Sequence, residues 1–114
     1  MSNYKVIDLE HGRPILADTL KVLEQELRNG KNNRYTAIKL IHGYGSTGKG
    51  GKLRIGVRKA LKKAKDDGRI RDFVCGEEFS IFTPAILSTL PKCAPLSKDA
   101  DLERRNQGIT IVIF

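Results

Sequence analysis

Tryptophan is absent from this sequence, and cysteine and methionine are scarce. The 114 residues include two cysteines, one methionine, three tyrosines and four phenylalanines. Cys75 and Cys93 lie too far apart for a CxxC motif, and neither has a Cys or His neighbour at the spacing of metal ligands. We therefore expect two reduced thiols in a cytoplasmic protein, rather than a disulfide framework.

Long apolar runs are also missing. No run approaches the length of a membrane-spanning helix, and the first residues, MSNYKVIDLEHG, contain no apolar core of a signal peptide. The length suits one domain, and 39% hydrophobic with 30% charged residues is typical of a globular protein. We expect residues 1–114 to form a single cytoplasmic domain with no membrane partner.

Acidic residues are missing from one stretch that is rich in basic ones. Eight of the 21 basic residues lie between Lys49 and Lys65, whereas the other 13 are equal in number to the 13 acidic residues of the chain. The net charge of +8 is therefore concentrated on this stretch. Such an excess indicates a polyanionic partner. The alternative is a solvated helix face whose lysines serve solubility.

The same region has the pattern of a strand, a glycine loop and a helix. Tyr35 to Ile41 is rich in β-branched and apolar residues, and His42 to Gly51 contains five glycines. From about Lys52, apolar residues recur at the spacing of one helix face. This arrangement presents backbone N–H groups and a helix N-terminus to an anion, so it predicts binding of a phosphate-bearing ligand.

The remaining elements follow from the same patterns. Lys5 to Leu9 is a short apolar strand, and leucines at helical spacing then predict a helix that Asn29-Gly30 ends. Ile70 to Cys75 reads as a third strand. Gly108 to Phe114 is a continuous apolar run, which predicts a strand buried on both faces.

The segment Gly76 to Gln107 is long for a connection in so small a domain. Short helical turns are expected at Ala85 to Leu90 and at Asp101 to Arg105. A segment of this length, about 76–107, is expected to be a functional lid or an ordered surface excursion. The order β-α-β-α-β-(long loop)-β predicts an α/β two-layer sandwich with a mixed, mostly parallel sheet.

The glycine loop also fits a second motif. Gly43 to Lys49 has the spacing G-x-x-x-x-G-K of a phosphate loop. Gly50, however, stands where a Ser or Thr would bind Mg²⁺, and no later strand ends in a clear acidic ligand. These departures argue against a nucleotidase, which stays as one alternative to a nucleic-acid contact. The other alternative is a flexible loop that binds no ligand.

Several motifs along the chain match one family. They are Asp8-Leu9, the helix residues Ala17 and Leu20, the HGxG sequence in Ile41 to Gly45, Lys52-Leu53-Arg54, and Gly108 to Val112. With these motifs the sequence resembles the small MutS-related (Smr) domain over nearly its whole length. The exception is Gly76 to Gln107, which is usually much shorter in Smr domains. The resemblance implies an α/β sandwich that binds nucleic acid and, in several members, cuts DNA or RNA.

The sequence departs from the family at one motif. Smr domains have the motif Asp-x-His-Gly near the first strand. When Ala17 is kept aligned with the family, Asp8 matches the aspartate of this motif. Glu10 then takes the place of the histidine, and His11 takes the place of the glycine. The loop between Gly45 and Lys52 also carries extra residues. The rival hypothesis is therefore a binding module, for example one associated with RNA or the ribosome, that has lost catalysis through Glu10.

Four residues are candidates for catalysis: Asp8, Glu10, His11 and His42. His42 follows a strand beside the glycine loop, where ligands bind in open α/β sheets, and a histidine there can transfer a proton or be structural. Asp8 and Glu10 close the neighbouring strand, where two carboxylates can bind Mg²⁺ or Mn²⁺ or activate water; alternatively, either one caps the first helix. His11 is the alternative proton donor if the strand end shifts by one residue.

Nucleic-acid contacts are expected on the loop and the basic helix. The predicted residues are Gly43, Tyr44, Gly45, Ser46, Thr47, Gly48, Lys49, Lys52, Arg54, Arg58, Lys59 and Lys62. Tyr44 is the one aromatic residue on the loop and can stack on a base or sugar. Because aromatic residues are few, contacts to phosphate with a preference for structured DNA or RNA are expected rather than stacking along a single strand.

Overall fold

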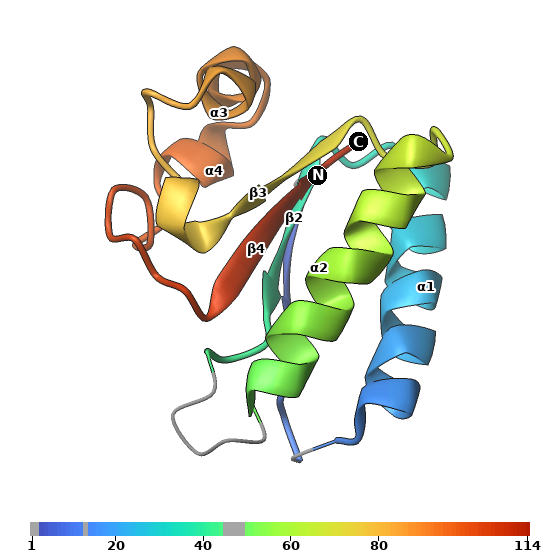
Figure 1. Ribbon diagram of the computed structural model, residues 1–114. Helices are drawn as coiled ribbons and strands as arrows, with labels where there is room; N and C mark the ends of the chain where they lie inside the picture. Colours follow the sequence, from blue (N-terminus) through green and yellow to red (C-terminus); the bar gives the residue numbers. More distant parts are fainter. Residues whose placement is uncertain (1–2, 13, 45–49) are drawn as a thin grey trace.

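The computed structural model describes residues 3–12, 14–44 and 50–114. Within these residues four strands form one sheet in the order β1-β2-β4-β3 (Figure 1). The strands are β1 (Tyr4–Asp8), β2 (Ala37–Ile41), β3 (Asp72–Cys75) and β4 (Ile109–Ile113). β1 is parallel to β2, and β4 is antiparallel to β2 and β3, so that β1, β2 and β3 run in the same direction. The predicted α/β fold with a mixed sheet is confirmed; three strands share one direction, but two of the three pairings between neighbouring strands are antiparallel.

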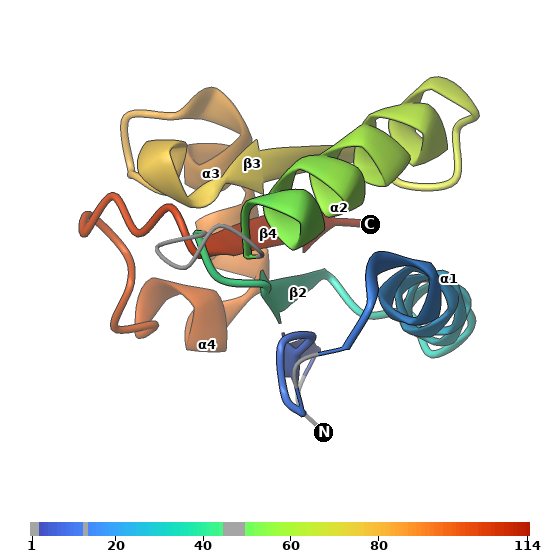
Figure 2. The ribbon, with the colours of Figure 1, turned by 60° about the horizontal axis from the view of Figure 1, so that its bottom comes forward.

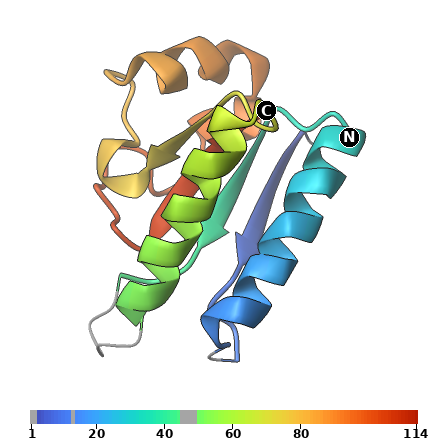
Figure 3. The same ribbon diagram turned by 45° about the vertical axis from the view of Figure 1, so that its right-hand side comes forward.

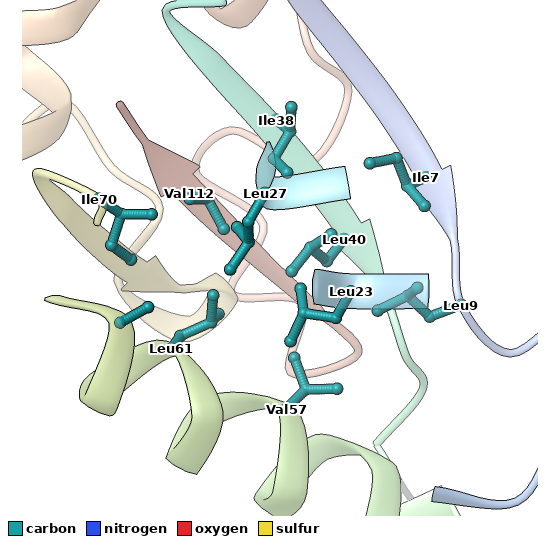
Figure 4. Close-up of a cluster of buried hydrophobic side chains, with 11 residues drawn as sticks. Ile7, Leu9, Leu23, Leu27, Ile38, Leu40, Val57, Leu61, Ile70 and Val112 are labelled. Atoms are coloured by element: carbon teal, nitrogen blue, oxygen red, sulfur yellow. The ribbon is translucent and has the colours of Figure 1, made fainter. Parts of the chain in front are cut away.

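Two long helices cover one face of this sheet. α1 (Leu16–Asn32) and α2 (Gly50–Asp66) lie side by side, as Figures 1 and 3 show. Their leucines and valines recur at helical spacing, and the buried side of each helix therefore faces the strands. Figure 4 shows the resulting core, which includes Ile7, Leu23, Leu27, Ile38, Leu40, Val57, Leu61 and Val112.

One predicted helix end is wrong. α1 does not stop at Asn29-Gly30 but continues to Asn32, and Gly30 is buried within it. The ring of Phe114 occupies the space that a side chain at position 30 would need. The chain turns only at Arg34, whose φ of 56° is in the left-handed region. Glycine here serves close packing rather than helix termination.

The segment after β3 covers the opposite face of the sheet. It contains η1 (Gly76–Glu78), α3 (Pro84–Thr89), η2 (Leu90–Lys92) and α4 (Ala94–Ser97), which lie across the sheet from α1 and α2 (Figure 1). A second core forms there from Ala37, Val74, Phe79, Ile86, Cys93, Leu96, Ile109, Ile111 and Ile113. Helices on both faces explain why every residue of β4 is buried.

The details of this segment differ in part from the prediction. α3 and η2 include the helical turn predicted for residues 85–90. The turn predicted from Asp101 to Arg105 is not helical, because Glu103 and Arg105 adopt positive φ values of 68° and 55°. α4 was not predicted.

A buried ionic cluster fixes the end of this segment. Lys39 of β2 is 7% exposed, and its ammonium group contacts Asp101 and, at 2.8 Å, the carboxylate of Asp99. The hydroxyl of Tyr4 donates to Asp99 at 2.7 Å, and Asn106 donates to Asp101 at 3.0 Å. Burial alone would lower the pKa of Lys39, but the hydrogen bonds with the two carboxylates raise it overall. The cluster therefore ties residues 99–106 to the sheet just before β4.

The described part of the chain contains no helix with both the length and the apolar character needed to cross a membrane.

Candidate functional site

Three loops meet at one end of the sheet. β1 and β2 end there, β4 begins there, and Figure 2 shows the first turns of α2 close to the start of β4. The backbone N–H of Leu9 donates to the carbonyl of Ile41 at 2.7 Å. The N–H groups of His42 and Gly43 both donate to the carbonyl of Gly108, at 2.9 and 3.0 Å. We call residues 8–11, 42–44 and 106–108 together the strand-end surface.

The backbone of His42 is part of this surface, but its side chain lies beneath it. Its side chain is fully buried, with Nδ1 2.7 Å from the carbonyl oxygen of Gly43 and Nε2 2.8 Å from the hydroxyl of Thr110. Because a carbonyl oxygen only accepts, Nδ1 carries the proton, and the neutral ring accepts at Nε2 from Thr110. Burial, together with the charges of Arg58 and Arg54, lowers the pKa of His42 to about 4. This geometry supports a role in holding the loop and does not support the predicted role as proton donor.

The buried histidine gives the protein a specific dependence of stability on pH. The folded pKa of about 4 is below the unfolded value of about 6.5, so the unfolded chain gains a proton first as the pH falls. The free energy of unfolding should therefore fall by about 2 kcal/mol between pH 7 and pH 5. Chemical denaturation at the two pH values measures this loss. His42→Gln should abolish most of it, whereas His11→Gln should keep it; equal losses in both variants would contradict the assignment.

Among the described residues of the loop, Gly43 has a backbone conformation that requires glycine. Its φ is +75°, and a Cβ atom at this position would collide with the carboxylate of Glu10. The structure thus brings Glu10 from the end of β1 against Gly43 from the end of β2. The predicted contacts Gly45, Ser46, Thr47, Gly48 and Lys49 lie outside the described residues.

The other three predicted catalytic residues are exposed at the same end. The carboxylate of Asp8 accepts the backbone N–H of Glu10 at 3.0 Å, and Glu10 lies in the turn beyond β1. Neither residue caps α1, because the N-cap residue of α1 is Ile15 and no side chain forms a capping hydrogen bond at this helix end. The alternative that Asp8 or Glu10 caps the first helix is therefore wrong. His11 lines a depression of about 130 Å³ with Asp8 and Asp18, between β1 and the start of α1.

The described residues fit only a loosely held metal ion. They contain no group of three or more His, Cys, Asp or Glu side chains that could enclose one. Mg²⁺ commonly uses one or two carboxylates and completes its shell with water and substrate phosphate. Asp8 and Glu10 are therefore candidates for holding a hydrated Mg²⁺ or Mn²⁺ of that kind, and not part of a closed protein cage.

The basic residues of α2 divide into two groups. Lys62, Lys63 and Lys65, in the second half of the helix, pair with Asp66, Asp67 and Asp72 at 3.7, 3.0 and 3.0 Å. Lys52 and Arg54 in the first turns, and Lys59 just past the middle of the helix, pair with no acidic side chain among residues 3–12, 14–44 and 50–114. We call these three the uncompensated cations. Within α2, the unpaired positive charge therefore extends from the first turns, beside the strand-end surface, to just past the middle of the helix.

Arg58 belongs to neither group. Its guanidinium forms a bidentate pair with Glu77, at 2.8 and 3.1 Å, and Nε donates to the hydroxyl of Thr110 at 3.1 Å. Its side chain is 17% exposed. A guanidinium held in this way is occupied by protein groups and is a poor first contact for a phosphate.

A larger hollow lies on the other side of the Arg58–Glu77 pair. It has a volume of about 610 Å³, and its lining includes Glu77, Glu78 and Glu103 with the 84% exposed Phe82. The three carboxylates outnumber the one arginine of the lining, Arg105, so the hollow carries excess negative charge and would repel a polyanion. The nucleic-acid candidate surface is therefore the strand-end surface together with the part of α2 that carries Lys52, Arg54 and Lys59.

Several partners of the residues at this site were not predicted from the sequence. A role for Thr110 could have been predicted, since it is the one polar residue in the apolar run of β4. The pairs Lys62–Asp66 and Lys63–Asp67 could also have been predicted, because opposite charges four residues apart on a helix lie next to each other. No sequence pattern indicated that Glu77 contacts Arg58, because the two residues lie on different elements of the fold.

Together these features define an α/β domain in which a glycine turn joins the end of a central strand to a basic helix. The fold is that of an Smr domain: the chain is similar to the crystal structure of the Smr domain of Thermus thermophilus MutS2, with a TM-score of 0.58 and 23% sequence identity. The likeness covers 96% of this chain and 95% of that one. The sequence matches no family model and no curated protein.

Proposed function

We propose that this chain binds structured DNA or RNA, mainly through its phosphates. One observation carries the proposal: the uncompensated cations Lys52, Arg54 and Lys59 lie on the helix that starts beside the strand-end surface. An excess of one sign on the edge of an α/β sheet attracts a polyanion, because each phosphate contact releases condensed counterions. The Smr-like fold agrees with the motif resemblance, which implies nucleic-acid binding.

Tyr44 supplies the second element of the proposed interface. It directly follows Gly43 at the strand-end surface, and its side chain is 56% exposed. An exposed aromatic ring next to free cations can stack on a base while the cations contact the backbone. A single ring of this kind favours junctions, ends or bulges, where a base is already unstacked.

Salt titration of binding tests the proposal directly. If three to five cations contact phosphates, log K should fall with log salt at a slope of about −3 to −4.5. Fluorescence anisotropy with labelled duplex, branched and single-stranded DNA and RNA measures both the slope and the preferred shape. A slope near zero, or no binding in low salt, would contradict the proposal.

Phosphodiester cleavage is a second candidate function. It is favoured by the three exposed groups Asp8, Glu10 and His11, which lie at the same end of the sheet as the start of α2. In this proposal Asp8 and Glu10 hold a hydrated divalent ion or accept a proton, and His11 donates one. His42 then keeps the loop in place rather than taking part in proton transfer.

Cleavage, where it occurs, is expected to depend on Mg²⁺ or Mn²⁺. Asp8→Asn, Glu10→Gln and His11→Ala should each lower its rate by about 100-fold or more, with binding largely kept. Single-turnover cutting of the best-bound substrate, with and without metal, measures the effect. Asp67→Asn, at the far end of α2, is the control. Strong metal-free cutting in Asp8→Asn and Glu10→Gln would contradict these roles, and binding without cutting would support the pure binding module.

A further inference from the structure

Arg58 connects two elements that are distant in sequence. Besides the pair with Glu77 of η1, its guanidinium donates to the backbone carbonyls of Ile109 and Gln107, at 3.1 and 3.3 Å. Those two carbonyls flank Gly108. All of these contacts use the planar fork of the arginine, which a lysine cannot reproduce.

Two routes lead from this guanidinium to the turn at His42–Gly43. In the first, Arg58 donates to Thr110, Thr110 donates to Nε2 of His42, and Nδ1 of His42 donates to the carbonyl of Gly43. In the second, Arg58 holds the backbone on either side of Gly108, whose carbonyl accepts the N–H groups of His42 and Gly43. The turn is thus held at its N–H groups by Gly108 and at its carbonyl by His42, and Arg58 contacts the residues next to both.

The ion pair with Glu77 positions the guanidinium of Arg58. It is the acidic partner of Arg58 among the described residues, and it approaches with both carboxylate oxygens. We propose that Glu77 is a positioning residue for nucleic-acid binding: through Arg58 it fixes the His42–Gly43 turn and so the presentation of Tyr44. The inference rests on the proposed function for its ligand, whereas the coupling between Glu77 and the turn stands on the contacts alone.

The neighbouring Glu78 makes a matched comparison possible. It is exposed, carries the same charge and makes no contact with Arg58. Removal of a negative charge near a polyanion site strengthens binding, so Glu78→Gln should raise affinity slightly. Glu77→Gln removes the same charge but also loosens Arg58. Its affinity for a labelled branched DNA or RNA should therefore be about three- to tenfold below that of Glu78→Gln.

Amide hydrogen exchange reports the turn in the free protein. Glu77→Gln should speed exchange of the His42 and Gly43 amides by about tenfold, since local opening becomes easier. The Leu9 amide, bonded to Ile41 at the same end of the sheet, is the internal control and should not change. Arg58→Lys, which keeps the charge but not the fork, should reproduce the effect and replaces Glu77→Gln if that variant does not fold.

The outcomes separate this inference from the proposed function. Unchanged exchange at His42 and Gly43 in both variants would overturn the positioning role. So would a Glu77→Gln protein that binds as tightly as Glu78→Gln, since Glu77 would then act only through its charge. Faster exchange at the turn in a protein that binds no nucleic acid would support the coupling and overturn the proposed function.

Discussion

Lys39→Met is expected to lower the free energy of unfolding by about 3 to 5 kcal/mol. The ammonium group sits between the carboxylates of Asp99 and Asp101, and the side chains of Lys39 and Asp99 are only 9% and 6% exposed. Methionine fills a similar volume but leaves the carboxylates of Asp99, which is buried, and of Asp101, which is 24% exposed, without their cation. Thermal or urea unfolding of the purified variant measures the loss.

Two comparisons make this expectation specific. Lys5→Met removes the more exposed pair with Glu26, whose lysine is 44% exposed, and should cost about 1 kcal/mol or less. Adding Asp99→Asn and Asp101→Asn to Lys39→Met removes the unpaired charges and should recover part of the stability. A loss for Lys39→Met no larger than that for Lys5→Met would show that water screens the cluster.

Loss of the three uncompensated cations should abolish most of the nucleic-acid binding. The triple change Lys52→Ala, Arg54→Ala and Lys59→Ala is expected to reduce affinity in low salt by about 100-fold or more and to flatten the salt slope by about 3. The reason is that none of the three has an acidic partner within the described chain, so each is available to a phosphate. Anisotropy titrations at several salt concentrations give both quantities.

The second half of the same helix provides the control. Lys62→Ala, Lys63→Ala and Lys65→Ala together remove the same charge, but these lysines pair with acidic side chains. Their loss should cost about tenfold or less. Equal losses in the two triple variants would mean that the whole helix acts as a diffuse basic surface. In that case the strand-end surface would have no special role.

The elements of the fold were predictable because periodicity reports burial. The β-branched and apolar residues marked β2, helical spacing of leucines and valines marked α1 and α2, and the unbroken apolar run marked β4. Boundaries were less predictable, as Gly30 shows: glycine signals a helix end from sequence, but a ring from the chain terminus packed against it keeps it inside the helix. No local pattern contains that contact.

The candidate site was predictable in its location and only partly in its chemistry. The HGxG and Lys-Leu-Arg motifs located the turn and the basic helix, and the sequence also flagged Asp8, Glu10 and His11 beside them. The sequence did not reveal that His42 is buried and neutral. Burial of a single polar side chain depends on what lies above it, here Thr110 and the Gly43 carbonyl.

The sequence by itself determined the α/β class, the order of its elements and the position of the excess positive charge, because each of these is written in local spacing and composition. Tertiary structure decided which cations are free, which histidine is exposed, and that the segment after β3 forms a second core on the sheet. Those properties come from pairs such as Arg58–Glu77 and Lys39–Asp99, which are far apart in the chain. Charge compensation and burial act through space, so only the folded chain sets them.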